Sequence, residues 1–164
     1  MAYDGEETHL AKIAAFVLGS SGFGSRLMEE VRVKRGLAYS AYGRFALKRS
    51  VSYFTGHVQT KLESEEEAIQ VIGEVVAEFV KNGITAKELE GAKAFLLGSE
   101  PLRTETLSQR LGRAFDEYYA HKPLGENARE LERIEGVSLE EINAFIREHG
   151  EIEKLSFYVV TKKI

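Results

Sequence analysis

The sequence predicts an α+β fold in which a small, mostly antiparallel sheet carries its helices packed on one face. Two stretches rich in Tyr, Phe and Val, a late apolar run, and four helix-capping pairs support this prediction. The 164 residues suffice for one domain with a substantial core, and no linker or repeat divides them. We therefore interpret residues 1–164 as a single domain.

The amino-terminal half is predicted to form two helices followed by a β-hairpin. Apolar residues recur at helical spacing over residues 4–18, and the glycine-rich residues 19–25 end that helix. A shorter helix is expected over residues 25–34, with Gly36 as its stop. Strands are expected at residues 37–47 and 51–60, joined across residues 48–50.

Capping boxes predict four more helices. In a capping box, a hydroxyl and a carboxylate or amide three residues later satisfy the free backbone N–H groups at the start of a helix. The pairs are Ser64 with Glu67, Thr85 with Glu88, Thr106 with Gln109, and Ser138 with Glu141. Gly83 is expected to stop the first of these helices and Gly150 the last. A further helix is expected near residues 127–134.

The final predicted element is a strand at residues 155–161. Its near-continuous apolar run is typical of a strand that is buried on both faces or central in the sheet.

The most informative segment joins the glycine-rich residues to a helix and then to a strand. It reads Phe-Gly-Ser-Arg-Leu-Met-Glu-Glu-Val-Arg-Val-Lys-Arg-Gly-Leu-Ala-Tyr-Ser over residues 23–40, and places Tyr39 seven residues after Arg32. A guanidinium offers several donors to a carbonyl or carboxylate, and a phenol donates one directed hydrogen bond. The pair therefore suits binding of a peptide backbone; a surface arginine beside a cross-strand aromatic residue is the alternative.

This ordered string resembles the carboxy-side, non-catalytic domain of zinc peptidases that carry the inverted H-x-x-E-H motif: the pitrilysin, insulinase and mitochondrial processing peptidase family. The resemblance extends over nearly the whole chain and is most specific over residues 23–40. It implies that Arg32 and Tyr39 hold the backbone of a peptide substrate in a closed chamber.

The resemblance also implies that Gly19, Gly22, Phe23 and Gly24 form a loop that contacts substrate; a plain turn between helices is the alternative. It further implies a processing-peptidase-like half-domain lacking its leading strand, because the family has one more strand before the first helix. An unpaired sheet edge invites a partner strand, so a homo- or hetero-oligomer is expected.

Zinc binding by this chain is not predicted. The inverted motif needs two histidines four residues apart, whereas His9, His57, His121 and His149 are widely separated. The sequence has no cysteine and no G-x-S-x-G. We expect no cofactor and no catalytic residue in this chain, which should be inactive alone. The resemblance implies that zinc and the general base come from a catalytic H-x-x-E-H chain or domain.

The composition restricts other functions. A net charge of -4 gives no basic surface for nucleic acid, and no apolar run is long enough to span a membrane. The absence of a signal peptide favours a soluble cytoplasmic protein over an exported one. His57, on the second strand of the hairpin, is a candidate to face the same cleft as Tyr39, because strand positions two apart share a face.

Three functional hypotheses remain open from the sequence. The first is a substrate-holding, non-catalytic half of a zinc metalloendopeptidase. The second is a structural or assembly subunit of the same fold with no peptidase role. The third is an independent enzyme of another type, which has the least support because no pair of nucleophile and base is visible.

Overall fold

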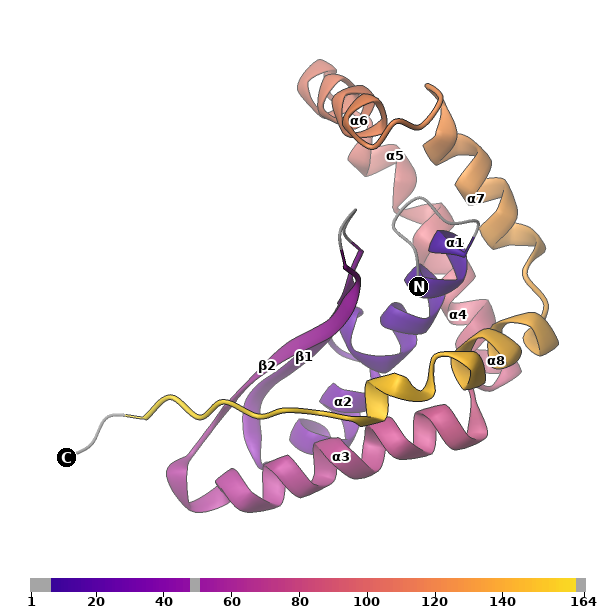
Figure 1. Ribbon diagram of the computed structural model, residues 1–164. Helices are drawn as coiled ribbons and strands as arrows, with labels where there is room; N and C mark the ends of the chain where they lie inside the picture. The colour runs from indigo at the N-terminus through magenta and orange to yellow at the C-terminus, as the bar shows by residue number, and fades with distance from the viewer. Residues whose placement is uncertain (1–6, 48–50, 162–164) are drawn as a thin grey trace.

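A computed structural model describes residues 7–47 and 51–161 of the 164-residue chain. A two-stranded hairpin lies beside a larger group of helices, which confirms the α+β class (Figure 1). The elements are α1 (Thr8–Ala15), the π-helix η1 (Phe16–Ser20), α2 (Arg26–Met28), the π-helix η2 (Glu29–Val33), β1 (Ala38–Ala46), β2 (Tyr53–Thr60), the 3₁₀ turn η3 (Leu62–Ser64), α3 (Glu65–Asn82), α4 (Ala86–Gly98), α5 (Glu100–Arg103), α6 (Leu107–Tyr119), α7 (Glu126–Gly136), α8 (Leu139–Glu148) and the 3₁₀ turn η4 (Gly150–Glu153).

The predicted hairpin is confirmed. Strands β1 and β2 pair antiparallel, with Gly43 opposite Gly56 and Phe45 opposite Phe54. One face packs against the helices, where the Phe54 ring occupies the space that a side chain at Gly43 would fill. The predicted turn at residues 48–50 lies outside the described residues.

Glycine allows the first helical segment to touch the sheet. A Cβ atom added to Gly19 would lie 2.6 Å from the backbone nitrogen of Gly43, so η1 and β1 meet backbone to backbone. Only a residue without a side chain tolerates that approach. The contact fixes the hairpin against the helices that begin the chain.

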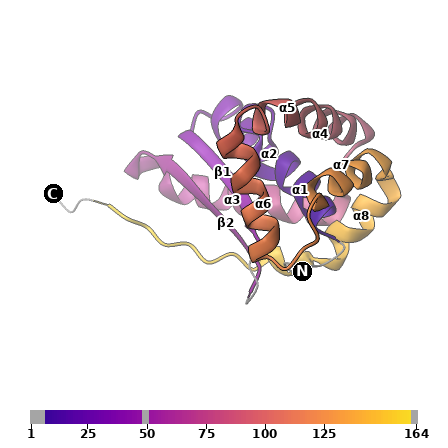
Figure 2. The ribbon, with the colours of Figure 1, turned by 90° about the horizontal axis from the view of Figure 1, so that it is seen from above.

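The core lies where α1 packs against α4, α7, α8 and β1, and where α3 packs against α2, η2 and α8 (Figures 1 and 2). Ile13 and Leu18 come from the first helical segment, Val76 and Phe79 from α3, and Ile142 from α8; all five are fully buried. The predicted apolar face of the helix after Ser64 is therefore confirmed as a core face.

Three of the four predicted capping boxes form. Thr85, Thr106 and Ser138 each accept a hydrogen bond from the backbone N–H three residues later. The box at Ser64 is wrong: α3 starts after the turn η3, and Ser64 there lacks the extended backbone of an N-cap (φ -106°, ψ 7°).

Other boundaries shift only slightly. The first two predicted helices each change to π-helical hydrogen bonding partway along, at Phe16 and at Glu29. Helix α7 confirms the expected helix near residues 127–134, and α8 ends at Glu148, before the predicted stop at Gly150. The short helix α5, which carries a proline in its first turn, was not predicted.

The prediction that residues 155–161 form a strand buried in the sheet is wrong. The segment runs extended along one side of the molecule and pairs with no other strand of the described chain (Figure 1). Tyr158 is 92% exposed and Val160 is 97% exposed. A strand requires a hydrogen-bonded neighbour, and a groove separates this segment from β2, so its apolar run alone does not make it part of the sheet.

None of the helices described is both long and apolar enough to pass through a membrane.

Candidate functional site

The structure brings Arg32 and Tyr39 together and adds Phe23 to them. The guanidinium carbon of Arg32 lies 4.8 Å from the ring centroid of Phe23 and 5.0 Å from that of Tyr39. Both distances are within the range of cation–π contact. The rings are largely exposed, at 70% for Phe23 and 71% for Tyr39. We call these three residues the Arg32 site.

Local backbone geometry places each member. Gly22 and Gly24 adopt positive φ angles of 69° and 97°, which turn the chain sharply on both sides of Phe23. Ser25 then caps α2: its hydroxyl donates to the carbonyl of Gly22 at 2.8 Å and accepts from the N–H of Met28. Phe23 is thereby presented at the tip of an ordered turn.

The other aromatic ring is positioned by a break in the strand register. Gly36, with φ 63°, ends the helical segment that carries Arg32. Ala38 pairs with Thr60 and Ser40 with Gln59, so Tyr39 is an extra residue between two consecutive pairs. Such a bulge redirects a side chain, and here it leaves Tyr39 beside Arg32 instead of within the regular alternation.

The Arg32 guanidinium has no carboxylate partner among residues 7–47 and 51–161. The nearby Glu30 is bound to Lys34 and Arg35 instead, each at 2.5 Å. Hydrogen bonds from these two cations hold the pKa of Glu30 below its ordinary value. Glu30 therefore stays charged but is directed away from Arg32, and the donors of Arg32 remain available to a ligand.

Arg26 provides a contrast within the same helical segment. Its guanidinium donates to both carboxylate oxygens of Glu88, at 2.7 and 2.8 Å, and to the carbonyl of Gly83 at 2.8 Å. It also lies over the ring of Phe79, with its carbon 5.6 Å from the centroid. Burial opposes ionisation of Glu88, but Arg26 and Thr85 outweigh it and lower the pKa of Glu88. Arg26 connects helices; Arg32 does not.

The four residues predicted to form one substrate-contact loop lie in two different parts of the structure. Gly19 is buried against β1 and does not belong to the exposed turn. Gly22, Phe23 and Gly24 form that turn, and Phe23 carries its contact with Arg32. The glycines shape the turn and Phe23 supplies its side chain. The stacking of Phe23 on Arg32 was not predicted, although an aromatic residue between two glycines is a recognisable signal.

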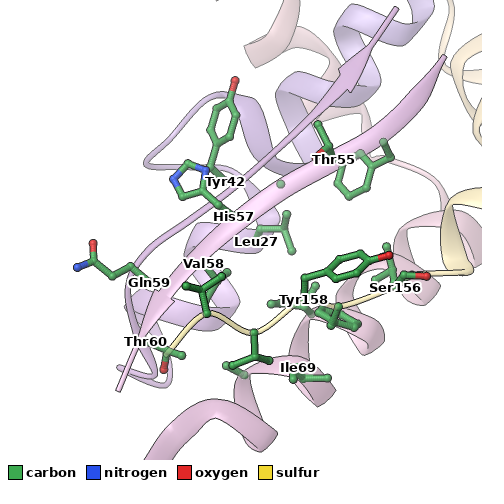
Figure 3. A pocket seen from close by; sticks show the side chains of 18 of the residues that line it. Leu27, Tyr42, Thr55, His57, Val58, Gln59, Thr60, Ile69, Ser156 and Tyr158 are labelled. Atoms are coloured by element: carbon green, nitrogen blue, oxygen red, sulfur yellow. The ribbon is translucent and has the colours of Figure 1, made fainter. Parts of the chain in front are cut away.

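His57 lies on the open face of the hairpin. Its ring centroid is 5.6 Å from that of Tyr42, the residue opposite it in β1, and both rings point the same way (Figure 3). The ring contact of His57 is thus with Tyr42, while Tyr39 contacts Arg32.

The four histidines bear on the expectation that this chain holds no zinc. Across the described ranges, no group of three or more His, Asp or Glu residues is arranged to hold a metal ion. His149 pairs with Glu7 and Glu151. His9 lies 4.0 Å from Glu141, in a separate pair.

A large cavity lies apart from the Arg32 site. It is a groove of about 930 Å³ bounded by β2, the start of α3 and residues 151–161, and neither Arg32 nor Tyr39 lines it (Figure 3). We call it the β2 groove. The predicted binding residues instead lie on an exposed surface formed by the glycine turn, η2 and the start of β1.

Comparison with known proteins identifies the family. A family described as the peptidase M16 inactive domain matches residues 1–96, more than half of the chain. The chain belongs to the peptidase M16 family. The resemblance that the sequence showed is confirmed, and the chain corresponds to the non-catalytic, carboxy-side domain of M16 proteins.

Several M16 relatives support this assignment. The chain is 46% identical over 153 residues to a "Non-peptidase homolog YmxG" of Helicobacter pylori, covering 93% of this chain and 35% of that protein. It is 33% identical over 135 residues to an "Uncharacterized zinc protease YmxG" of Bacillus subtilis, covering 80% of this chain and 32% of that one.

A solved structure has the same fold. The crystal structure of a peptidase M16 inactive domain from Pseudomonas fluorescens matches with a TM-score of 0.81 and 30% identity, over 90% of this chain and 35% of that one. The chain thus spans about a third of the length of the curated relatives and of this M16 structure.

Proposed function

We propose that this chain is the substrate-holding, non-catalytic part of a zinc-dependent M16 metalloendopeptidase. Arg32 and Tyr39 bind the peptide backbone, and a catalytic H-x-x-E-H chain or domain supplies the zinc ion and the general base. The observation that carries the proposal is an arginine in cation–π contact with two exposed aromatic rings and with no carboxylate partner in the described structure.

The chemistry of the Arg32 site fits a carbonyl or a carboxylate. The two ring contacts use the π-faces of Phe23 and Tyr39 and not a hydrogen-bond acceptor, so they do not occupy the N–H donors of the Arg32 guanidinium. These donors form charge-assisted hydrogen bonds with peptide oxygens. The phenol of Tyr39 supplies a further donor beside it. In an M16 protein these groups would orient a peptide for cleavage by the catalytic part.

The structural role also has an observation in its favour. The Helicobacter pylori relative, 46% identical, is named a non-peptidase homolog. A chain of that kind would keep the fold and the Arg32 site without supporting cleavage. The two hypotheses differ in whether loss of Arg32 affects proteolysis.

The test uses native mass spectrometry to find the H-x-x-E-H partner in cell extract, followed by cleavage assays on the reconstituted pair. We expect Arg32→Ala to lower kcat/KM by roughly ten- to a hundredfold, because a charge-assisted hydrogen bond contributes about 1.5–3 kcal/mol. Tyr39→Phe should give a smaller loss. Both variants should still form the pair.

Arg35→Ala is the matched control, because Arg35 is a nearby exposed arginine that is bound to Glu30. It should cleave like the unchanged protein. If the complex has no peptidase activity, or if Arg32→Ala cleaves as well as Arg35→Ala, the substrate-holding role is wrong and the structural role is favoured.

A further inference from the structure

The charges of this chain are distributed unevenly along its sequence. Of the 22 lysines and arginines, seven lie within residues 31–62, whereas none of the 26 aspartates and glutamates lies there. That stretch contains the end of η2 and both strands of the hairpin. The net charge of -4 therefore results from a basic hairpin stretch and an acidic remainder.

Arg44 is a cation of this stretch that no carboxylate neutralises. Lys34 and Arg35 are both bound to Glu30. The side chain of Arg44 is exposed and has no ion pair or hydrogen bond within residues 7–47 and 51–161. Arg44 thus resembles Arg32 in having donors available to a ligand.

Strand geometry places Arg44 beside two aromatic rings. In the hairpin register Arg44 is opposite Thr55, and Tyr42 is opposite His57. Because strand positions two apart share a face, Tyr42, Arg44 and His57 lie on the face opposite to the buried Ala41. Arg44 is then a diagonal neighbour of His57, with Cβ atoms roughly 7–8 Å apart. We call Tyr42, Arg44 and His57 the Arg44 cluster.

The two rings of the Arg44 cluster are in contact and open to a ligand. Their centroids are 5.6 Å apart and their planes are inclined by 34°. Figure 3 shows both side chains projecting from the hairpin on the side away from Ser156 and Tyr158. Both also line the margin of the β2 groove, so there is space beside them.

The chemistry of the Arg44 cluster fits a carboxylate. The guanidinium of Arg44 offers two parallel hydrogen bonds to one carboxylate. The phenol of Tyr42 and the imidazole of His57 each add an N–H or O–H donor. No carboxylate of the hairpin competes with a ligand, because residues 38–60 contain no aspartate or glutamate.

We propose that the Arg44 cluster is a specificity subsite that binds an aspartate or glutamate side chain of a peptide held at the Arg32 site. Tyr39 of the Arg32 site precedes Tyr42 by three residues, so the two sites lie no more than about 10 Å apart along β1. Three residues of an extended peptide span the same distance. The inference rests on the proposed substrate-holding function and adds the substrate class, which is acidic peptides.

A peptide fits this surface better than a nucleic acid does. Binding of nucleic acid depends on many cations that contact successive phosphates. All 26 acidic residues of the chain lie outside the basic stretch and would repel a long polyanion. A single acidic side chain needs only the Arg44 cluster.

Two labelled peptides test the acidic preference with the chain as it is. Both have about ten residues and the same sequence, except that one carries glutamate and the other glutamine at every third position. Fluorescence anisotropy at low salt should show about three- to tenfold tighter binding of the glutamate peptide. Because the whole chain is negative, non-specific attraction would favour the glutamine peptide instead. Equal affinities, or no binding of the glutamate peptide, would overturn the proposal.

Arg44→Gln and Arg35→Gln form a matched pair of variants. Each removes one positive charge from the same stretch, and Arg35 is already bound to Glu30. Arg44→Gln should abolish most of the preference for glutamate and leave the affinity for the glutamine peptide unchanged. Arg35→Gln should keep the preference. An equal loss in both variants would mean that the overall charge selects the peptide, and the subsite would be wrong.

Arg32→Ala separates this proposal from the substrate-holding function. It should weaken binding of both peptides by the same factor, because the backbone contact is common to them. If Arg32→Ala changes neither affinity while Arg44→Gln still abolishes the preference, the substrate-holding role of the Arg32 site fails and the acidic subsite stands.

A single-stranded oligonucleotide is the competing ligand. A labelled ten-nucleotide strand should bind more weakly than the glutamate peptide. Tighter binding of the oligonucleotide that is lost in Arg44→Gln would overturn the assignment of the Arg44 cluster to an acidic peptide.

Discussion

Two arginines six residues apart have opposite surroundings. Arg26 is bound to Glu88 on α4 and lies over Phe79, while Arg32 is held by aromatic rings alone. A charged side chain bound by a carboxylate contributes to packing, whereas one oriented only by ring faces keeps its donors for a ligand. The difference in partners, rather than in residue type, is the reason why we propose a binding role for Arg32 and not for Arg26.

Phe23 should act as a positioning residue for Arg32. Removing its ring in Phe23→Leu is expected to weaken binding of a labelled, unstructured peptide about two- to fivefold, since an exposed cation–π contact contributes about 0.5–1 kcal/mol. Fluorescence anisotropy with the isolated chain measures the change. Phe23→Tyr keeps the ring and should bind normally; if Phe23→Leu does so too, the ring is not needed to orient Arg32.

At the scale of elements, polar side chains determine how helices start and how they are joined. The carboxylate of Glu117 in α6 accepts from the N–H groups of Gly125 and Asn127, each at 2.8 Å, and so binds the start of α7. Asn143 of α8 similarly accepts from the N–H of Ile84, at 2.7 Å, between α3 and α4. These contacts order the connections that hydrophobic spacing alone does not define.

Arg26→Met should destabilise the fold. The change leaves the half-buried carboxylate of Glu88 without its bidentate partner, and we expect a loss of about 1–3 kcal/mol in the free energy of unfolding. Urea unfolding followed by circular dichroism measures it. Arg35→Met breaks a more exposed pair and should cost less than about 1 kcal/mol. Similar losses in both variants would contradict the structural role of Arg26.

Glu117 should make stability depend on pH. Burial tends to raise its pKa, but the backbone N–H groups of Asn127 and Gly125 outweigh this and hold the pKa below its ordinary value. Its stabilising effect is therefore fully present above the unfolded-state pKa, about 4.3, and is lost as pH falls through the lower folded-state pKa.

The variant Glu117→Gln tests that pH dependence. It should be less stable than the unchanged chain at pH 7, with a difference that narrows as the pH is lowered below about 4.3. Urea midpoints measured over a pH series supply the comparison. A difference that stays constant with pH would mean that the ionised carboxylate is not what α7 requires.

At the scale of the molecule, apolar surface remains outside the core. The exposed side chains of α6 repeat at helical spacing through Leu107, Leu111 and Phe115, and the segment at residues 155–161 adds a second apolar surface. Figure 1 shows α6 at the far end of the helical part, away from α3. Contiguous apolar surface of this kind is uncommon on monomers.

The isolated chain should therefore associate in solution. Sedimentation velocity over a series of micromolar concentrations is expected to show dimers or larger species whose fraction grows with concentration. Replacing Leu111 and Phe115 together by lysine should reduce that fraction if α6 contributes. A monomer at every concentration would contradict the expected homo-oligomer and leave a different partner chain as the form of assembly to seek.

The sequence alone predicted much of the fold because its signals are local. Capping pairs at Thr85, Thr106 and Ser138 mark helix starts through contacts within one turn, and they are confirmed. The failure at Ser64 has a local cause too, since a 3₁₀ turn replaces the extended N-cap backbone. The family resemblance, most specific in the ordered string at residues 23–40, is confirmed by the family match over residues 1–96.

The sequence by itself determined the α+β class, the hairpin, most helix starts and the spacing of Arg32 and Tyr39, because each depends on residues close together in the chain. Only the tertiary structure decided that Phe23 completes the Arg32 site and that Arg26 does not belong to it. It also decided that residues 155–161 stand apart from β2 across a groove. Stacking, ion pairing and strand pairing depend on which distant residues meet, and no local pattern contains that information.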